Sequence, residues 1–171
     1  MTKMTKFLGL GILFFFLASM QLSAQKCKFD YEKEDPLTGA QTKGNTFTVK
    51  VYWKIGFNKV GDKYTISMWL RMNGQVRDII TPENNIVFKL ENGEIITVFA
   101  NDSYVGRSQA TQNGVLTVYD AIFAVSEDDI KKLAASPLTY VRMPIGALTA
   151  ESELNTKKGA EFQGKAKCIL Q

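Results

Sequence analysis

The 171-residue sequence contains no histidine. This excludes nucleophilic sites that need an imidazole, such as Ser-His-Asp and Cys-His, and zinc sites with histidine ligands. The chain has only two cysteines, Cys27 and Cys168, which are too few for a thiolate cluster and too far apart for a Cys-x-x-Cys redox motif. Gly-rich phosphate-binding motifs are absent as well. We therefore predict no cofactor and no metal, and the remaining enzymatic options are carboxylate pairs, Ser-Lys dyads and carboxylate-bound cations.

The first 24 residues have the pattern of a secretory signal peptide. Lys3 and Lys6 form a basic start, an apolar run extends from Phe7 to Met20, and small residues precede Ala24. The run is shorter than the ~20 residues that a bilayer span requires. We expect cleavage after Ala24, no transmembrane segment afterwards, and one exported domain over residues 25–171, located in the periplasm, at the cell surface or outside the cell.

The predicted mature chain has a small net charge. The signal segment carries two lysines and no acid, so its removal lowers the formal net charge from +4 to +2. Nucleic-acid binding requires clustered Lys and Arg. The only dense basic stretch is interrupted by Glu161, and we interpret it as a solvated face rather than a contact with an anionic surface. We predict no nucleic-acid partner. The stretch comprises Lys157, Lys158, Lys165 and Lys167.

The two cysteines lie at opposite ends of the predicted domain. Export to an oxidising compartment favours a Cys27–Cys168 disulfide. The alternatives are two free thiols, or acylation of Cys27 as a lipoprotein, for which Lys26 is a poor fit. A disulfide closing so long a loop stabilises the folded state by at most about 5 kcal/mol in the chain-entropy description.

Two segments alternate apolar and polar residues with the period of a half-buried strand. The first covers residues 47–57, with Tyr52 and Lys54 in the polar phase; the second covers residues 64–72, with Trp69 and Arg71 in the polar phase. The loop over residues 58–63 predicts a hairpin. Pairing Phe57 with Tyr64 keeps the apolar faces together and places Tyr52 opposite Trp69, whereas a two-residue slip separates that pair.

The rest of the chain predicts more strands and one or two short helices. Asn92-Gly93 and Asn113-Gly114 are typical hairpin turns. Ser126 is expected to cap a helix that buries Ile130 and Leu133 and ends before Pro137. A tail helix over residues 155–170 would bury Ala160, Phe162, Ala166 and Ile169, although Gly159 and Gly164 weaken it. The expected strands are 75–80, 86–90, 94–99, 107–112, 115–125 (central) and 138–143, with a loop at 144–150.

The predicted fold class is mostly β, a two-layer antiparallel β-sandwich with one or two short helices. Its most interesting surface is the polar face of the first hairpin, where Tyr52, Trp69, Lys54 and Arg71 form a candidate ligand-binding site. Aromatic rings on a polar strand face can stack on sugars or anchor a protein. The alternative is that a loop or the C-terminal segment covers these rings and makes them part of the core.

Acidic residues offer weaker candidates. Asp120 and Glu94 could form the carboxyl pair of a glycoside hydrolase if the fold brought them together. Residues 30–39 could supply oxygen ligands to calcium, but they lack EF-hand spacing, and Asp35-Pro36-Leu37-Thr38-Gly39 reads more simply as a turn.

Several local patterns resemble those of small exported, largely uncharacterised β-rich proteins of Bacteroidetes-type bacteria. The resemblance implies an exported β-rich domain and lends no catalytic residue. It rests on Cys27 followed by Tyr31 and the turn at residues 35–39, the hairpin at 88–96, the capped helix at 125–133, Tyr140-Val141-Arg142, and the cut site at 22–25.

We expect an exported, non-enzymatic binding or interaction domain that contacts a protein or a glycan through the aromatic sheet face. A carboxylate-dependent hydrolase acting on glycans and a structural or assembly component of the cell envelope are the alternatives.

Overall fold

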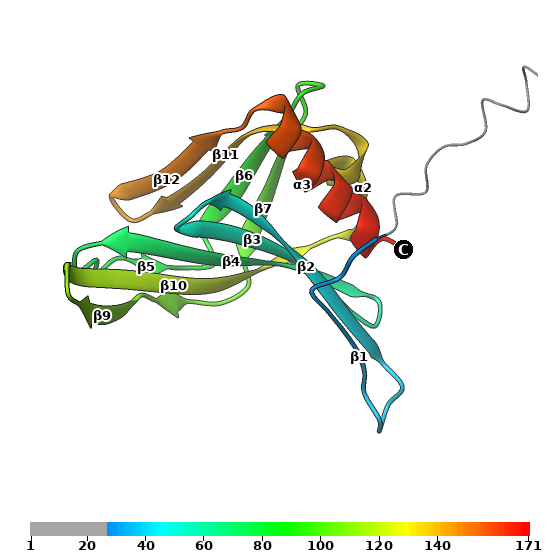
Figure 1. Cartoon of the computed structure of the whole chain (residues 1–171), viewed down its shortest axis with the longest axis horizontal. Coiled ribbons are helices and arrows are strands. Elements are labelled where there is room, and N and C mark those ends of the chain that lie inside the picture. Colours follow the sequence, from blue (N-terminus) through cyan, green and yellow to red (C-terminus); the bar gives the residue numbers. More distant parts are fainter. Residues whose placement is uncertain (1–26) are drawn as a thin grey trace, which may run out of the picture.

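The computed structural model describes residues 27–171, and the predicted signal peptide lies outside them. The fold is mostly β, with antiparallel sheets and two helices, as the sequence predicts (Figure 1). The elements are β1 (Tyr31–Glu34), β2 (Gln41–Lys50), β3 (Trp53–Val60), β4 (Lys63–Asn73), β5 (Ile79–Ile80), β6 (Asn85–Leu90), β7 (Ile95–Ala100), β8 (Tyr104–Val105), β9 (Arg107–Thr111), β10 (Gly114–Val125), α2 (Glu127–Ala135), β11 (Leu138–Ile145), β12 (Leu148–Glu153) and α3 (Thr156–Ile169).

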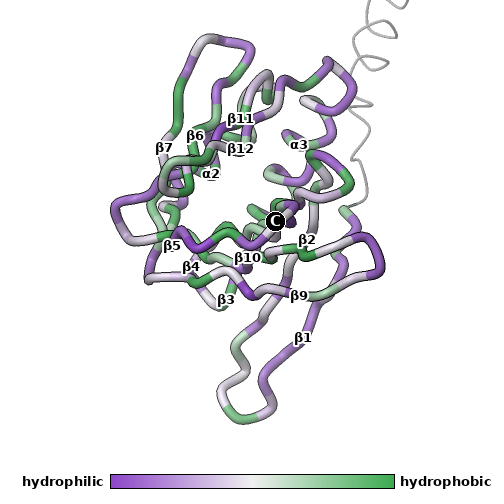
Figure 2. Tube along the Cα trace, turned by 90° about the vertical axis from the view of Figure 1, so that its left-hand side faces the viewer, coloured by the Kyte–Doolittle hydropathy of each residue, from purple (hydrophilic) through white to green (hydrophobic). Residues whose placement is uncertain are grey.

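The sandwich-like arrangement is built from one bent ten-stranded sheet. Its strand order is β1-β2-β3-β4-β10-β7-β6-β11-β12, with β9 paired to β10 off this path. Figure 2 shows β6, β7, β11 and β12 above and β2, β3, β4 and β10 below, with α3 at one side. Strand β10 lies near the middle of the order and pairs with β4, β7 and β9, which confirms its predicted central position.

Helix α3 joins the two parts of the sheet through Phe162. The Phe162 ring centroid lies 5.3 Å from that of Phe47 on β2, 5.0 Å from that of Phe57 on β3, and 5.5 Å from that of Phe88 on β6. All four rings are fully buried. One aromatic side chain therefore ties the C-terminal helix to strands that are far apart in the sheet order.

The tail helix confirms the predicted segment, but one of its predicted buried residues is wrong. Asn155 caps the helix by accepting a hydrogen bond from the Lys158 amide at 2.9 Å. Phe162, Ala166 and Ile169 are buried as predicted, whereas Ala160 is exposed and Gly159 is buried instead. A Cβ atom at Gly159 would lie 2.3 Å from the carbonyl oxygen of Leu138. The helix can approach β11 closely at Gly159 because that residue has no side chain. With Gly159 on the buried face, its neighbour Ala160 lies on the exposed one.

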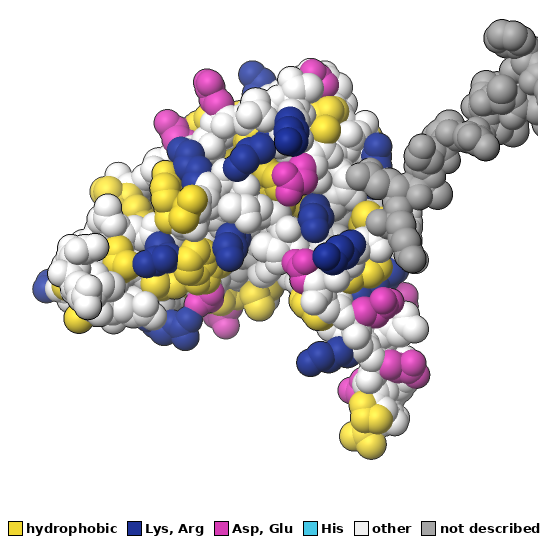
Figure 3. All heavy atoms as spheres, viewed as in Figure 1, with side chains coloured by type: hydrophobic (Ala, Val, Ile, Leu, Met, Phe, Trp, Pro, Cys, Tyr) yellow, Lys and Arg dark blue, Asp and Glu magenta, His cyan; other side chains and the backbone are white. Residues whose placement is uncertain are grey.

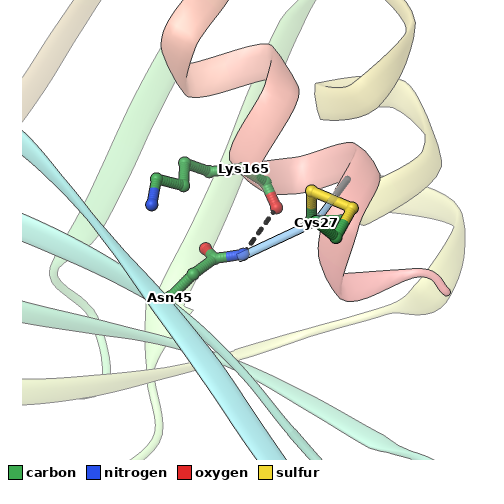
Figure 4. The surroundings of a disulfide bond; sticks show 4 residues. Cys27, Asn45 and Lys165 are labelled. Atoms are coloured by element: carbon green, nitrogen blue, oxygen red, sulfur yellow. Dashed lines mark hydrogen bonds between the residues drawn. A yellow bond between two sulfur atoms is a disulfide. The ribbon is translucent and has the colours of Figure 1, made fainter. Parts of the chain in front are cut away.

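The predicted disulfide between Cys27 and Cys168 is confirmed (Figure 4). It connects the start of the described chain to the last turn of α3 across 141 positions. Beside it, the Asn45 side-chain amide on β2 donates a 3.0 Å hydrogen bond to the carbonyl oxygen of Lys165. The N-terminal segment, β2 and α3 are thus held together at one place.

The predicted single strand over residues 47–57 is wrong. The structure has two strands, β2 and β3, joined by a turn at Val51 and Tyr52, and Lys50 pairs with Trp53. Val51 is 86% exposed instead of lying on the buried face. The turn contains neither Gly nor Asn, the residues that usually mark a two-residue reversal. A register shift between Thr48 and Lys50 keeps the alternation in phase across the turn, so the pattern looks continuous.

The predicted hairpin between residues 58 and 63 is confirmed, and of the two registers considered it has the one slipped by two residues. Phe57 pairs with Ile66 rather than Tyr64, and Trp69 pairs with Lys54 rather than Tyr52. The strands continue to Val60 and resume at Lys63, so only two residues form the turn. This shorter loop produces the two-residue slip that preserves the buried face but separates Tyr52 from Trp69.

Both predicted hairpins are confirmed, at the β6–β7 and β9–β10 connections, with Gly93 and Gly114 at positive φ. The second turn lies one residue earlier than predicted, at Gln112 and Asn113, because Gly114 already pairs with Thr111. The capped helix α2 is also confirmed: Ser126 Oγ accepts from the Asp129 amide at 3.0 Å, and Ile130 and Leu133 are buried.

Two other predictions are wrong. The strand expected at 75–80 is reduced to β5, which pairs with the short strand β8 in a second sheet. The loop expected at 144–150 is a β11–β12 hairpin. Pro144 fits there because it lies beyond the β11 residues that pair with β6, where its missing N–H removes no bond to that neighbour.

Candidate binding site

Trp69 lies half-buried on the outer face of the sheet, in the middle of a row of paired residues. Lys54 on β3 is its partner on one side, and Asp120 on β10 is its partner on the other. The Lys54 Nζ lies 5.5 Å and the Arg71 Cζ 5.7 Å from the centroid of the indole ring. Lys54, Trp69 and Arg71, three of the four predicted site residues, therefore come together, as expected from their shared position in the polar phase of the strands.

The charges around Trp69 are mainly positive. Asp120 is the nearest paired acid, and its carboxylate forms an ion pair with Arg107 of β9. Lys54 has no salt bridge among the described residues, and neither does Arg71. Both cations can therefore attract an anionic group that approaches the indole.

A groove of about 420 Å³ extends beside Trp69. Its floor is low over β2, β3 and β4, where the next row across the strands consists of Thr46, Gly56 and Ser67, and the row continues on β10 with the larger Ile122. A Cβ atom at Gly56 would lie 2.4 Å from the Ser67 Oγ, so the glycine lets that hydroxyl lie over the β3 backbone. Small side chains next to a large indole create a step against which a flat ring can lie.

Tyr104 on β8 also lines this groove, and sequence reasoning missed it. Its hydroxyl donates a hydrogen bond to the Asn101 Oδ1 and lies 3.4 Å from the carbonyl oxygen of Ile122 on β10. The position of Tyr104 depends on the β5–β8 pairing, which no local pattern predicts. Gly56 could have been noticed, because a glycine inside a strand often marks a close approach.

Tyr52 lies apart from Trp69, in the β2–β3 turn, and is 47% exposed. The Lys50 Nζ lies 6.0 Å from its ring centroid. The predicted arrangement of Tyr52 directly opposite Trp69 is wrong, because the two-residue slip pairs Trp69 with Lys54. Neither ring belongs to the buried core, so the alternative that the C-terminal segment covers them does not hold.

A second cleft, of about 560 Å³, includes Tyr52 in its lining. It lies between the β2–β3 turn, the end of β4, the start of β10, and β12. Figure 3 shows hydrophobic side chains interspersed with Lys and Arg on the face that includes β3, β4 and β12. Arg71 lines this cleft too, while its guanidinium lies near Trp69, so it stands between the two sites.

The candidate carboxylates are not brought together. Asp120 lies in the middle of β10, whereas Glu94 follows the β6–β7 turn, with its Oε1 3.9 Å from the Nζ of Lys132 on α2. Residues 27–171 contain no group of three or more His, Cys, Asp or Glu that could hold a metal ion. Nor does that part of the chain contain a helix long and apolar enough to cross a membrane.

The acidic segment at residues 30–39 comprises strand β1 and, from Asp35 to Gly39, the predicted turn. The Asp35 Oδ1 accepts hydrogen bonds from the amides of Leu37 at 2.8 Å and Thr38 at 3.1 Å, and Gly39 has a φ of 68°. These amides, Leu37 first, lower the pKa of the Asp35 carboxyl. The backbone of the turn therefore engages one oxygen of the Asp35 carboxylate, as expected of a turn.

Comparison with known proteins found no matching protein family, no matching curated protein and no matching solved structure. The resemblance to exported proteins of Bacteroidetes-type bacteria stays a prediction.

Proposed function

We propose that this chain is an exported, non-enzymatic binding domain that recognises an acidic glycan in the groove beside Trp69. The observation that carries the proposal is the half-buried indole set between Lys54 and Arg71, next to a row of small side chains. Sheet-face aromatics offer sugar rings a flat apolar surface, and nearby polar groups can fix the orientation of a ligand.

Charge supports an acidic rather than a neutral glycan. The two cations near the indole have no carboxylate partner among the described residues, and the Asp120 carboxylate is already paired with Arg107. A sugar carboxylate can form charge-assisted hydrogen bonds with a guanidinium or an ammonium group. A sugar ring that stacks on the indole face occupied by Lys54 must displace the ammonium group. The loss of this cation–π contact costs about 0.5–1 kcal/mol at an exposed site.

This proposal assumes that the protein is exported to an oxidising compartment. The Cys27–Cys168 disulfide and the signal-like start of the sequence support it, because disulfides persist in oxidising compartments. Edge-to-edge assembly, the structural alternative, has less support, because β1 carries three charged residues among its four and charged edge strands resist pairing with another chain.

The test is titration calorimetry of the disulfide-bonded protein with oligogalacturonate, using maltooligosaccharide of equal length as the neutral comparison. Trp69→Ala is expected to weaken oligogalacturonate binding at least tenfold, equivalent to about 1.4 kcal/mol. Lys54→Gln should weaken it several-fold, and added salt should weaken it further because the contact is exposed.

Tyr52→Ala is the matched control, since it removes an exposed aromatic ring outside the groove. It should leave glycan affinity unchanged. Equal affinity of Trp69→Ala and the unmodified protein, or a preference for the neutral oligosaccharide, would show that the proposal is wrong.

A further inference from the structure

We propose that the cleft between β12 and the β2–β3 turn binds a single-chain amphiphile with a carboxylate head, such as a fatty acid. This site adjoins the groove beside Trp69 and shares Arg71 with it, but it does not rest on the function proposed for that groove. The cleft is the place where the bent sheet fails to close: β12 is the last strand of the sheet order, and it faces the ends of β3 and β4 without pairing to them.

The interior of the cleft is apolar. Trp53, Leu70 and Met72 contribute side chains from the inner phase of β3 and β4, and Leu148 and Ala150 contribute from β12. A volume of about 560 Å³ lies within the range of about 300–1,000 Å³ that is usual for small-molecule sites. A flexible hydrocarbon chain suits an apolar gap between two strand layers, because burial of each CH₂ contributes about 0.8 kcal/mol.

The rim is rich in hydrogen-bond donors. Arg71 and Tyr52 line the cleft. Lys50 lies beside the lining residues: its Nζ donates to the backbone carbonyl of Glu151 at 3.1 Å and lies 6.0 Å from the Tyr52 ring centroid. The indole Nε1 of Trp53 is buried and has no acceptor among the described residues. Because Trp53 is fully buried, this donor belongs to the interior of the cleft and takes no part in holding a head group at the rim.

The one carboxylate at this rim is already engaged. The Glu151 Oε2 accepts a 2.6 Å hydrogen bond from the Tyr140 hydroxyl on β11. That hydrogen bond leaves the negative charge of Glu151 in place, but Lys50 and Arg71 carry two positive charges against it, so the cleft entrance is positive on balance. An apolar interior with a cationic rim is complementary to an apolar chain that ends in a carboxylate, and this commits the proposal to that ligand chemistry.

The chain provides its own reporter for the experiment. It contains two tryptophans, and Trp69→Phe leaves Trp53 as the only one, while removing the indole of the other site. Palmitate, added below its aggregation concentration, should change Trp53 emission saturably in this variant. Ala150→Phe fills the cleft and should weaken the binding at least tenfold, whereas Ala110→Phe, on exposed β9, should leave it unchanged.

The head group is tested separately, with variants that leave the interior intact. Lys50→Gln with Arg71→Gln should weaken palmitate about tenfold, as expected for lost hydrogen bonds to a charged group, without changing the binding of 1-hexadecanol. No saturable emission change with palmitate would overturn the proposal. So would equal affinity of Ala150→Phe and Ala110→Phe, or an equal loss of palmitate and hexadecanol binding in the double variant.

Discussion

The ring of Phe162 on α3 packs at an angle against the ring of Phe57 on β3, with 5.0 Å between their centroids. Phe162→Ala would remove this contact together with those to Phe47 and Phe88, and leave a cavity between helix and sheet. We expect a loss of about 3–5 kcal/mol in the free energy of unfolding, measured by denaturant titration. Phe99→Ala, at a ring that is 51% exposed, should change it much less. Similar losses in both variants would contradict the central role of Phe162.

The disulfide leads to a second prediction. Cys27→Ser with Cys168→Ser should lower the free energy of unfolding by at most about 5 kcal/mol, because the unfolded chain regains the freedom of a very long loop. The double substitution avoids leaving one reactive thiol. Thermal unfolding of the variant, compared with the oxidised protein at equal concentration, measures the change. Alkylation of the native oxidised protein should label no thiol, and two labelled thiols would refute the bridge.

Features set by local sequence could be predicted. Period-two alternation placed the strands around the first hairpin, Asn-Gly pairs placed two turns, and Ser126 placed the start of α2. The β2–β3 turn at Val51 and Tyr52 could not be placed, because it uses no residue that favours a reversal and leaves the alternation in phase. The β5–β8 pair joins segments about 25 positions apart, and its short strands carry no pattern of their own.

The candidate site divides in the same way. Lys54, Trp69 and Arg71 share one face because of strand periodicity, which the sequence contains. Tyr52 does not lie opposite Trp69, because the turn at Gly61 and Asp62 is shorter than expected and shifts the register of β3 and β4 by two residues. Such a shift cannot be detected from the alternation of apolar and polar residues. Tyr104 lines the groove beside Trp69 only because of tertiary packing, which the local sequence does not predict.

Two glycines in α3 provide a third prediction, with opposite signs expected. Gly164 has open space where a Cβ would lie, so Gly164→Ala should raise the free energy of unfolding by about 0.5–1 kcal/mol through helix propensity. Gly159→Ala should lower it, because the new methyl group would lie 2.3 Å from the carbonyl oxygen of Leu138. That backbone atom cannot move aside as a side chain could. Denaturant titration of both variants distinguishes packing from propensity, and stabilisation by both would contradict the close approach of α3 to β11.

The turn at Asp35 gives a prediction about pH. Hydrogen bonds from the amides of Leu37 and Thr38 lower the pKa of this carboxyl in the folded protein. The ionised form therefore adds stability above the unfolded-state pKa, and this contribution is lost as the pH falls through the lower folded-state pKa. Asp35→Asn keeps the accepting oxygen but removes the charge. The variant should be less stable than the unmodified protein at neutral pH and approach it under strongly acid conditions. Unfolding titrations across that range measure the difference, and a constant difference at every pH would show that the charge of Asp35 is not responsible.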